Sequence, residues 1–276
     1  MRIKKFFLIF LLIICIGVFF VSLNIIMQKY IQNMESKNAN NNLVKIITKQ
    51  EKNNIAVEEN IRGTNENEIE NENNNIEQEK SIKEGTKEKT ANTIDWNILS
   101  SINKDIIGWI EIPNTNINYP ILKDENLYYL NHTFEKKFNP NGSIFIYNQD
   151  LSKEKEIRIY GHNMKNGTMF ASLSKFMNKN FFENNSKVFI YTKDAIYEGN
   201  FFAVYSKNEN EENDNIKNLN LTEKLDYYKK QSINYKNLEI DFEKIIKLIT
   251  CSYINAKTNP TDQRYYLIAK MKKVNL

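Results

Sequence analysis

The chain has 276 residues, of which 38 are Lys or Arg and 34 are Asp or Glu, so its formal net charge is +4. This near balance, without a basic stripe or a nucleic-acid motif, argues against a strong polyanion such as nucleic acid as a partner. Apolar and polar residues are distributed unevenly along the chain, and their distribution divides it into three parts.

Residues 1–30 have the pattern of a membrane anchor. Residues 6–27 are apolar apart from two polar positions. As a helix they would extend about 33 Å at ~1.5 Å per residue, enough to cross a hydrocarbon core of about 30 Å. Basic residues precede this run at three of the first five positions, and only one closely follows it. This excess of positive charge predicts a cytoplasmic N-terminus and an external remainder.

The alternative to an anchor is a signal peptide that is cleaved. No small-x-small pair follows the apolar run, and the run is longer than a typical signal core, so an uncleaved anchor is favoured. Cys15 does not mark a lipid-modified signal, because Ile14 stands where a small residue would be needed. We interpret Cys15 as an apolar residue of the span.

Residues 31–93 differ sharply in composition from the anchor. These 63 residues contain 15 Asn, 12 Glu and 9 Lys or Arg, but no aromatic residue and no Pro. Such a segment cannot bury enough apolar surface to offset the entropy lost on ordering. The composition predicts a disordered, solvated stalk with only transient helical patches, such as residues 42–50.

Residues 94–276 are long enough for one hydrophobic core, and their pattern predicts a mainly β domain with peripheral helices. Runs rich in Ile, Val, Phe and Tyr predict strands at residues 106–112, 117–122, 143–147, 156–160, 187–192, 196–205, 245–251 and 265–271. Eight short strands in one domain of this size favour a closed or nearly closed β-barrel.

Helical patterns interrupt these strands. A cap at Thr93 or Asp95 predicts a short helix that ends at Ile102. Further helices are predicted at residues 125–131, 169–177 and 222–235. The last of them lies in a long polar excursion, residues 207–243, and a connection of that length in a compact domain is usually functional or disordered.

Cys251 is the residue that most strongly suggests chemistry. The other cysteine, Cys15, lies in the predicted membrane span and cannot reach it, so the Cys251 thiol is free. A free thiol outside the membrane is either buried and inert or retained because it reacts. Strand alternation places Cys251 on the face of Lys247 and Ile249, away from the apolar core face, which favours exposure.

A thiol attacks carbonyl groups as a thiolate, and His is the side chain best suited to take its proton near neutral pH. His162 ends a predicted strand before a Gly-containing loop, whereas His132 ends a helical patch, where a surface or capping role is ordinary. Arg264 opens another strand, and it either pairs with Asp262 or directs a permanent charge at an oxyanion. With Cys251, these residues predict an acyl-transfer site.

The same residues lie in motifs that resemble those of sortases. Leu248-Ile249-Thr250-Cys251 resembles the Leu-x-Thr-Cys signature, and Tyr160-Gly161-His162 resembles the segment of the catalytic histidine. Arg264 stands on the strand after the cysteine, where sortases carry an essential arginine. The upstream segments at residues 107–113, 117–121, 128–132 and 142–145 also resemble sortase sequences. The resemblance covers nearly all of residues 94–276.

The resemblance implies a cysteine transpeptidase that is anchored in the cell membrane of a Gram-positive type envelope, with its catalytic domain outside. Cys251 would attack the carbonyl after the Thr of a sorting signal near the C-terminus of a secreted protein. His162 would transfer protons at the leaving and incoming amines, and Arg264 would hold the substrate and its oxyanion. A peptidoglycan amine or a pilin lysine would accept the acyl group. Substrate contacts are expected from Thr250, Ile249 and Asn163.

Within the family the chain most resembles class B, because a helix precedes the barrel and the helix-bearing insertion 207–243 stands just before the cysteine strand. Lys247 departs from the pattern, since many sortases have Thr there, and Ile249 fills a variable position that contacts substrate in some relatives. The substrate preference is therefore left open. The barrel gives no reason to expect a metal or an organic cofactor, because the site loops lack an acidic cluster with calcium-like spacing.

Three alternatives are left open by the sequence. In a papain-like peptidase the cysteine would open a helix and precede the histidine, which is the reverse of the order here. A non-enzymatic surface barrel would bind a partner through residues 207–243, with Cys251 incidental. Inside the family, a class B enzyme that assembles pili would use the same residues on a different acceptor.

Overall fold

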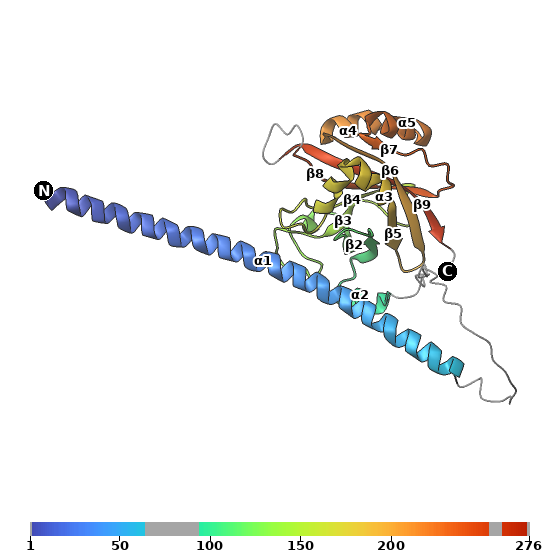
Figure 1. Ribbon diagram of the computed structural model, residues 1–276, viewed down its shortest axis with the longest axis horizontal. Coiled ribbons are helices and arrows are strands. Elements are labelled where there is room, and N and C mark those ends of the chain that lie inside the picture. The colour runs from blue at the N-terminus through green and yellow to red at the C-terminus, as the bar shows by residue number, and fades with distance from the viewer. Residues whose placement is uncertain (1, 64–93, 254–260, 275–276) are drawn as a thin grey trace, which may run out of the picture.

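A long helix and one closed sheet dominate the computed structural model, which describes residues 2–63, 94–253 and 261–274 (Figure 1). Helix α1 (Arg2–Gly63) has 62 residues. It contains an 18-residue window with a mean hydropathy of 3.2, none of which is buried against the rest of the protein. By length and composition, this helix is able to cross a membrane.

Helix α1 extends far beyond the predicted anchor. The prediction of a disordered stalk is wrong for residues 31–63, which continue the helix. Residues 64–93 lie outside the described residues, and the division of the chain at residues 30 and 93 stays a prediction. The average composition of residues 31–93 gave no sign of two apolar residues, Leu43 and Ile47, which lie one helical turn apart and pack on the domain.

Eight strands form the closed β-barrel that the sequence predicts. They are β1 (Ile106–Glu111), β2 (Asn118–Asp124), β3 (Ile144–Tyr147), β4 (Glu156–Tyr160), β5 (Lys187–Tyr191), β6 (Ile196–Asn208), β8 (Lys244–Cys251) and β9 (Gln263–Val274). Their order around the sheet is β5-β1-β2-β3-β4-β8-β9-β6, and the pairing of β5 with β6 closes it. A two-residue strand, β7 (Asn234–Tyr235), pairs with Ala203 and Val204 of β6.

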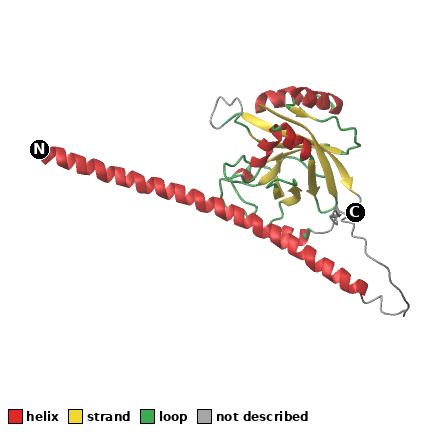
Figure 2. Cartoon of the chain, in the orientation of Figure 1, coloured by secondary structure: helices red, strands yellow, loops and turns green. Residues whose placement is uncertain are grey.

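Short helices surround the barrel, as the red segments outside the yellow sheet show in Figure 2. They are α2 (Trp96–Ile102), α3 (Lys179–Asn184), α4 (Glu209–Ile216), α5 (Leu221–Gln231) and the 3-10 turns η1 (Tyr128–Leu130) and η2 (Ala171–Met177). Asp95, one of the two predicted cap residues, caps α2 by accepting hydrogen bonds from two backbone N–H groups. The predicted helix 222–235 ends earlier because β7 takes its last residues, and α3 and α4 were not predicted.

The apolar pair on α1 packs against the barrel wall. Leu43 and Ile47 are only 2% and 6% exposed. They join a cluster that includes Leu99 of α2 and Trp109 of β1. Burial of these side chains supplies the apolar contact that orders this part of α1 on the domain.

Side-chain amides add polar contacts between α1 and the domain. Asn40 Nδ2 donates to the carbonyl oxygen of Asn118 at 3.2 Å. Nearer the N-terminus, the carbonyl oxygen of Gln32 accepts from Asn139 Nδ2 at 2.9 Å. The two contacts lie about two helical turns apart, so they define the direction of the helix along the barrel.

Strand β8 is buried on both faces. Ile246 and Leu248 belong to the cluster that fills the barrel. Ile245 and Ile249 face outward into a second cluster, together with Tyr228 of α5. Helices α4 and α5 therefore cover the outer side of the strand that ends at the predicted catalytic cysteine (Figure 1).

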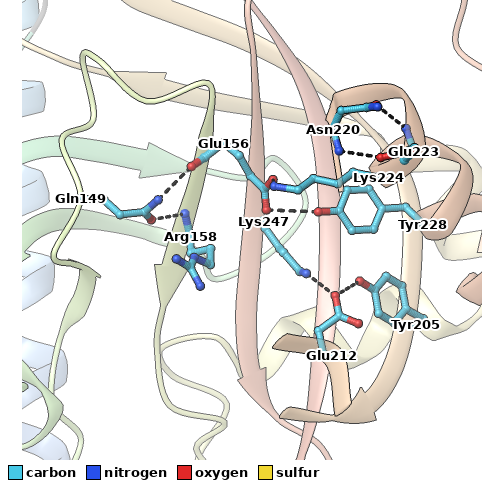
Figure 3. A network of polar contacts seen from close by, with 10 residues as sticks. All are labelled: Gln149, Glu156, Arg158, Tyr205, Glu212, Asn220, Glu223, Lys224, Tyr228 and Lys247. Atoms are coloured by element: carbon cyan, nitrogen blue, oxygen red, sulfur yellow. Dashed lines mark hydrogen bonds and ion pairs between the residues drawn. The ribbon is translucent and has the colours of Figure 1, made fainter. Parts of the chain in front are cut away.

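A buried ion pair joins α4 to this outer face. Lys247 Nζ of β8 contacts Glu212 Oε1 of α4, and both side chains are 1% exposed. Glu212 also accepts from the Tyr205 hydroxyl at 2.6 Å and from the Tyr227 hydroxyl at 2.8 Å. Burial lowers the pKa of Lys247, and the Glu212 carboxylate opposes that shift. Figure 3 shows the pair between the strand and the insertion.

A second ion pair attaches α5 to the neighbouring strand. Lys224 Nζ lies 2.7 Å from Glu156 Oε2 of β4, and the Tyr228 hydroxyl donates to the other carboxylate oxygen at 3.1 Å (Figure 3). Burial raises the pKa of Tyr228, so its phenol stays a neutral donor. The insertion is thus fixed at two separate points on the barrel.

We expect Leu43→Asp to detach α1 from the barrel, because a carboxylate cannot be buried in an apolar cluster without several kcal/mol of cost. Amide hydrogen exchange of the full-length chain in detergent should become faster in residues 31–47 and unchanged in the barrel strands. Ile46→Asp is the matched control, since Ile46 is 43% exposed on the same helix. Equal exchange in the two variants would contradict the docking.

We expect Lys247→Met to lower the free energy of unfolding by about 3 kcal/mol or more, because Glu212 would be left as an unpaired buried charge. The double variant Lys247→Met/Glu212→Gln should recover most of that loss. Chemical denaturation of the full-length chain measures both. Lys179→Met is the control, since its partner Glu183 is 3.9 Å away and both side chains are exposed. Similar losses in Lys247→Met and Lys179→Met would contradict the assignment.

Candidate active site

Three strand ends meet at one edge of the barrel and bring together His162, Cys251 and Arg264. Strands β4 and β8 are parallel with Tyr160 opposite Ile249, so both end at this edge. His162 follows Tyr160 by two residues, as Cys251 follows Ile249. Strand β9 is antiparallel to β8, and Arg264 is the direct partner of Cys251. The register therefore places the three predicted catalytic residues in one row.

A pocket of about 350 Å³ opens at this edge, and all three residues line it. The rest of its wall is mostly apolar and includes Leu127, Leu130, Phe145, Tyr147, Tyr160 and Ile249. Burial raises the pKa of Tyr160, so this wall residue presents a neutral phenol rather than a charge. A largely apolar pocket with a few convergent polar groups is typical of a site that binds a substrate and excludes water.

Cys251 is a free, half-buried thiol at the last position of β8. Its backbone is fixed from two sides. The Asn163 side-chain amide donates to the Cys251 carbonyl oxygen at 2.8 Å. The next residue, Ser252, donates its backbone N–H to the carbonyl oxygen of Gln263 at 2.8 Å. These contacts hold the thiol at the pocket edge, where the strand alternation predicted that it would be accessible.

His162 is oriented by a backbone carbonyl. Its Nε2 lies 2.8 Å from the carbonyl oxygen of Leu130. A carbonyl oxygen only accepts, so Nε2 carries the hydrogen and Nδ1 is left to exchange a proton. His132, by contrast, places Nδ1 2.8 Å from the carbonyl oxygen of Tyr128, and its ring stacks on the Tyr128 ring. This is the surface role that the sequence predicts for His132.

A glycine makes room for the carbonyl that holds His162. Gly142 has a φ of 59°, in the region that favours glycine. A Cβ atom at this position would lie 2.4 Å from the carbonyl oxygen of Leu130. The next residue, Ser143, donates its N–H to the carbonyl of Tyr129 at 2.9 Å. This turn therefore sets the position of the Leu130 carbonyl.

Arg264 is only partly exposed, and its guanidinium is held on several sides. One terminal nitrogen donates to the carbonyl oxygens of Thr261 at 2.7 Å and Gln263 at 3.1 Å. The other lies 2.8 Å from Glu209 Oε2. The expected alternative partner, Asp262, instead accepts from the side chain of Asn208 at 2.7 Å.

Of the three residues predicted to contact substrate, two line the pocket and the third supports the backbone of Cys251. Ile249 and Thr250 line the pocket, at 4% and 2% exposed. The Thr250 hydroxyl is buried without a hydrogen-bond partner among the described residues, so a donor is available close to the site. Asn163 supports the backbone of Cys251. Substrate binding by these residues stays a prediction.

Sequence reasoning missed two polar elements of the site. Glu209 lines the pocket from the start of α4, inside the insertion. Nothing in its local sequence separates it from the other acidic residues nearby. The contribution of Leu130 is a backbone carbonyl, which no side-chain motif can indicate. Only the folded barrel brings Leu130 to His162 and Glu209 to Arg264.

Comparisons with known proteins identify the family to which this sequence is similar. A family model described as a sortase domain matches residues 110–272. Sortase B of Listeria monocytogenes is 35% identical over 160 residues, a match that covers 55% of this chain and 65% of that protein, just under two thirds of its length.

Solved structures of class B sortases match the fold as well. The X-ray structure of Clostridium perfringens sortase B has a TM-score of 0.57 and 32% identity, covering 64% of this chain and 98% of that chain. A Streptococcus pyogenes class B sortase involved in pilus biogenesis has a TM-score of 0.56 and 27% identity, covering 64% of this chain and 97% of that chain.

The family model covers more than half of the chain, and both the curated and the structural relatives are class B enzymes. This result removes the papain-like peptidase and the non-enzymatic barrel from the alternatives. The chain belongs to the sortase family of cysteine transpeptidases, as a member of class B.

Proposed function

We propose that this enzyme is anchored in the cell membrane, cleaves a C-terminal sorting signal after Thr, and transfers the acyl part to an amine of the cell wall. The observation that carries the proposal is the row of His162, Cys251 and Arg264 on three adjacent strand ends, all lining one largely apolar pocket. Acyl transfer from a peptide requires a nucleophile, a proton carrier and a fixed cation close to one another.

In the first half-reaction the Cys251 thiolate attacks the carbonyl carbon of the Thr residue. The C–N bond that follows Thr breaks, and the imidazolium of His162 gives a proton to the leaving amine. A thioester then joins the Thr acyl group to Sγ of Cys251. The guanidinium of Arg264 donates hydrogen bonds to the oxyanion that develops on the carbonyl oxygen.

In the second half-reaction an incoming amine replaces the departed one. His162 accepts a proton from this amine as its nitrogen attacks the thioester carbon. A new amide bond forms, the C–S bond breaks, and Cys251 is released as a thiolate. The enzyme returns to its starting protonation, because the proton given in the first half-reaction is recovered in the second.

Helix α1 supplies the membrane anchor in this proposal. Its apolar run at residues 6–27 is long enough to cross a bilayer, and basic residues are concentrated before it. The N-terminus then lies in the cytoplasm and the barrel outside, where secreted proteins and wall amines are available as substrates.

A second candidate function is the assembly of pili, with a pilin lysine as the acceptor amine. The similarity to the Streptococcus pyogenes enzyme involved in pilus biogenesis favours keeping this candidate. The two functions share the first half-reaction and differ only in the amine. Competition between a wall-type amine and a lysine-bearing protein for the same thioester separates them.

The full-length chain in detergent should form a peptide-sized thioacyl adduct with an Asn-Pro-x-Thr-x or Ser-Pro-x-Thr-Gly peptide, detected by intact-mass spectrometry. Cys251→Ala should abolish the adduct, since the pocket then has no thiol. His162→Ala should slow it roughly 100-fold or more. Cys15→Ala should retain the adduct and serves as the control. An adduct on Cys251→Ala would refute the mechanism.

Gly142→Ala should lower kcat roughly tenfold or more, because its Cβ would displace the Leu130 carbonyl that orients His162. Steady-state peptide cleavage by the full-length chain measures the effect. Gly167→Ala is the matched control. Gly167 also has a positive φ, 80°, but a Cβ atom added there would lie 3.9 Å from its nearest neighbour, Asn116 Nδ2. Equal kcat values for the two variants would argue against this role of the carbonyl.

A further inference from the structure

The guanidinium of Arg264 is held by two kinds of contact. The carbonyl oxygens of Gln263, at the start of β9, and of Thr261, two residues before it, restrain one terminal nitrogen. The third partner, Glu209, comes from a different element, helix α4, and its Oε2 lies 2.8 Å from the other terminal nitrogen. Among the described residues, these contacts occupy at most three of the five N–H donors, so at least two have no partner there and are available to a substrate.

The position of Glu209 is fixed by the end of the β6–β9 ladder. Glu209 is the first residue of α4, directly after β6. Its backbone N–H donates to the carbonyl oxygen of Asp262 at 3.0 Å. The preceding residue, Asn208, donates its side-chain amide to Asp262 Oδ2 at 2.7 Å and caps α4. The carboxylate therefore starts from a backbone that is bound to the segment just before Arg264.

One helical turn further along, Glu212 anchors α4 to the catalytic strand. It pairs with Lys247, which precedes Cys251 by four residues on β8, and it accepts from two tyrosine hydroxyls. The Lys247 ammonium also lies over the ring of Tyr266, 4.6 Å from its centre. Both charges are 1% exposed, so helix α4 cannot move without separating a buried ion pair. Figure 3 shows the contact between the two side chains.

We propose that Glu209 is a positioning residue for Arg264, and that the buried pair of Glu212 and Lys247 holds α4 in the place from which Glu209 acts. This role rests on the proposed function, in which Arg264 donates to the oxyanion. An arginine side chain has a long flexible stem, and a donor aids catalysis most when it needs no rearrangement during the reaction. The ion pair with Glu209 restrains one end of the guanidinium, so its remaining donors stay directed into the pocket.

The first test compares Glu209→Gln with Glu211→Gln in the full-length chain. Both changes remove one charge from the first turn of α4, but Glu211 is exposed and does not line the pocket. Glu209→Gln should lower kcat for peptide cleavage roughly 10- to 100-fold with KM changed by less than about threefold, and Glu209→Asp should recover part of the loss. Glu211→Gln should match the unmodified enzyme.

The second test asks whether Glu209 acts through Arg264. The rate of thioacyl formation is measured by intact mass for Glu209→Gln, Arg264→Ala and the double variant. If Glu209 positions Arg264, its replacement should have no further effect once Arg264 is absent. A loss that multiplies in the double variant would mean that Glu209 acts elsewhere, and it would overturn the proposal.

Other outcomes are equally clear. A Glu209→Gln enzyme as active as Glu211→Gln, or more active than the unmodified enzyme, would overturn the positioning role while leaving the proposed function intact. An unmodified enzyme that forms no adduct with any peptide would overturn the proposed function and this role with it.

Discussion

The parallel pairing of β4 with β8 is the constraint on which the site depends. Parallel neighbours begin and end at the same edges, so His162 and Cys251 emerge side by side although they are far apart in sequence. The antiparallel partner β9 then has to enter at that edge, which brings Arg264 opposite the thiol. A slip of one residue in either register would turn the thiol to the other face of the sheet. Closure of the barrel protects against such a slip, because each strand is paired on both sides.

The insertion before β8 supports this register from outside. Helices α4 and α5 cover the outer face of β8, so the strand has buried apolar residues on both faces, while its two edges pair with β4 and β9. A buried ion pair is a costly way to attach a helix, because both charges lose their water. Lys247 and Glu212 offset part of that cost through tyrosine hydroxyls and rings. What the pair adds over an apolar contact is a unique position for α4, and hence for Glu209.

The sequence allowed the strands to be predicted, and it singled out the three residues that meet at the pocket, because both leave local signals. Runs rich in Ile, Val, Phe and Tyr marked all eight barrel strands, and Cys251, His162 and Arg264 stood in motifs at strand ends. Glu209 could not be predicted, since its partner becomes a neighbour only through the β6–β9 ladder. The contribution of Leu130 is a backbone atom, which leaves no signal. The continuation of helix α1 through residues 31–63 was missed for another reason: two apolar residues in an Asn-rich segment were outweighed by the average composition.

In the proposed topology, α1 also determines how the active site faces the membrane. Gln32, which accepts from Asn139, is five residues past the end of the apolar run, or about 7.5 Å of helix. Asn139 lies in the loop that follows Leu130, beside the pocket, and its N–H donates to the carbonyl of Asn131. Contacts further along α1 are made first to Asn118 at the start of β2 and then to Leu99 of α2. β8 likewise ends on the side of the barrel nearer the N-terminus of α1 (Figure 1). In this topology, a continuous helix docked in this direction would place the loop after Leu130, at one side of the pocket, nearer the membrane than α2.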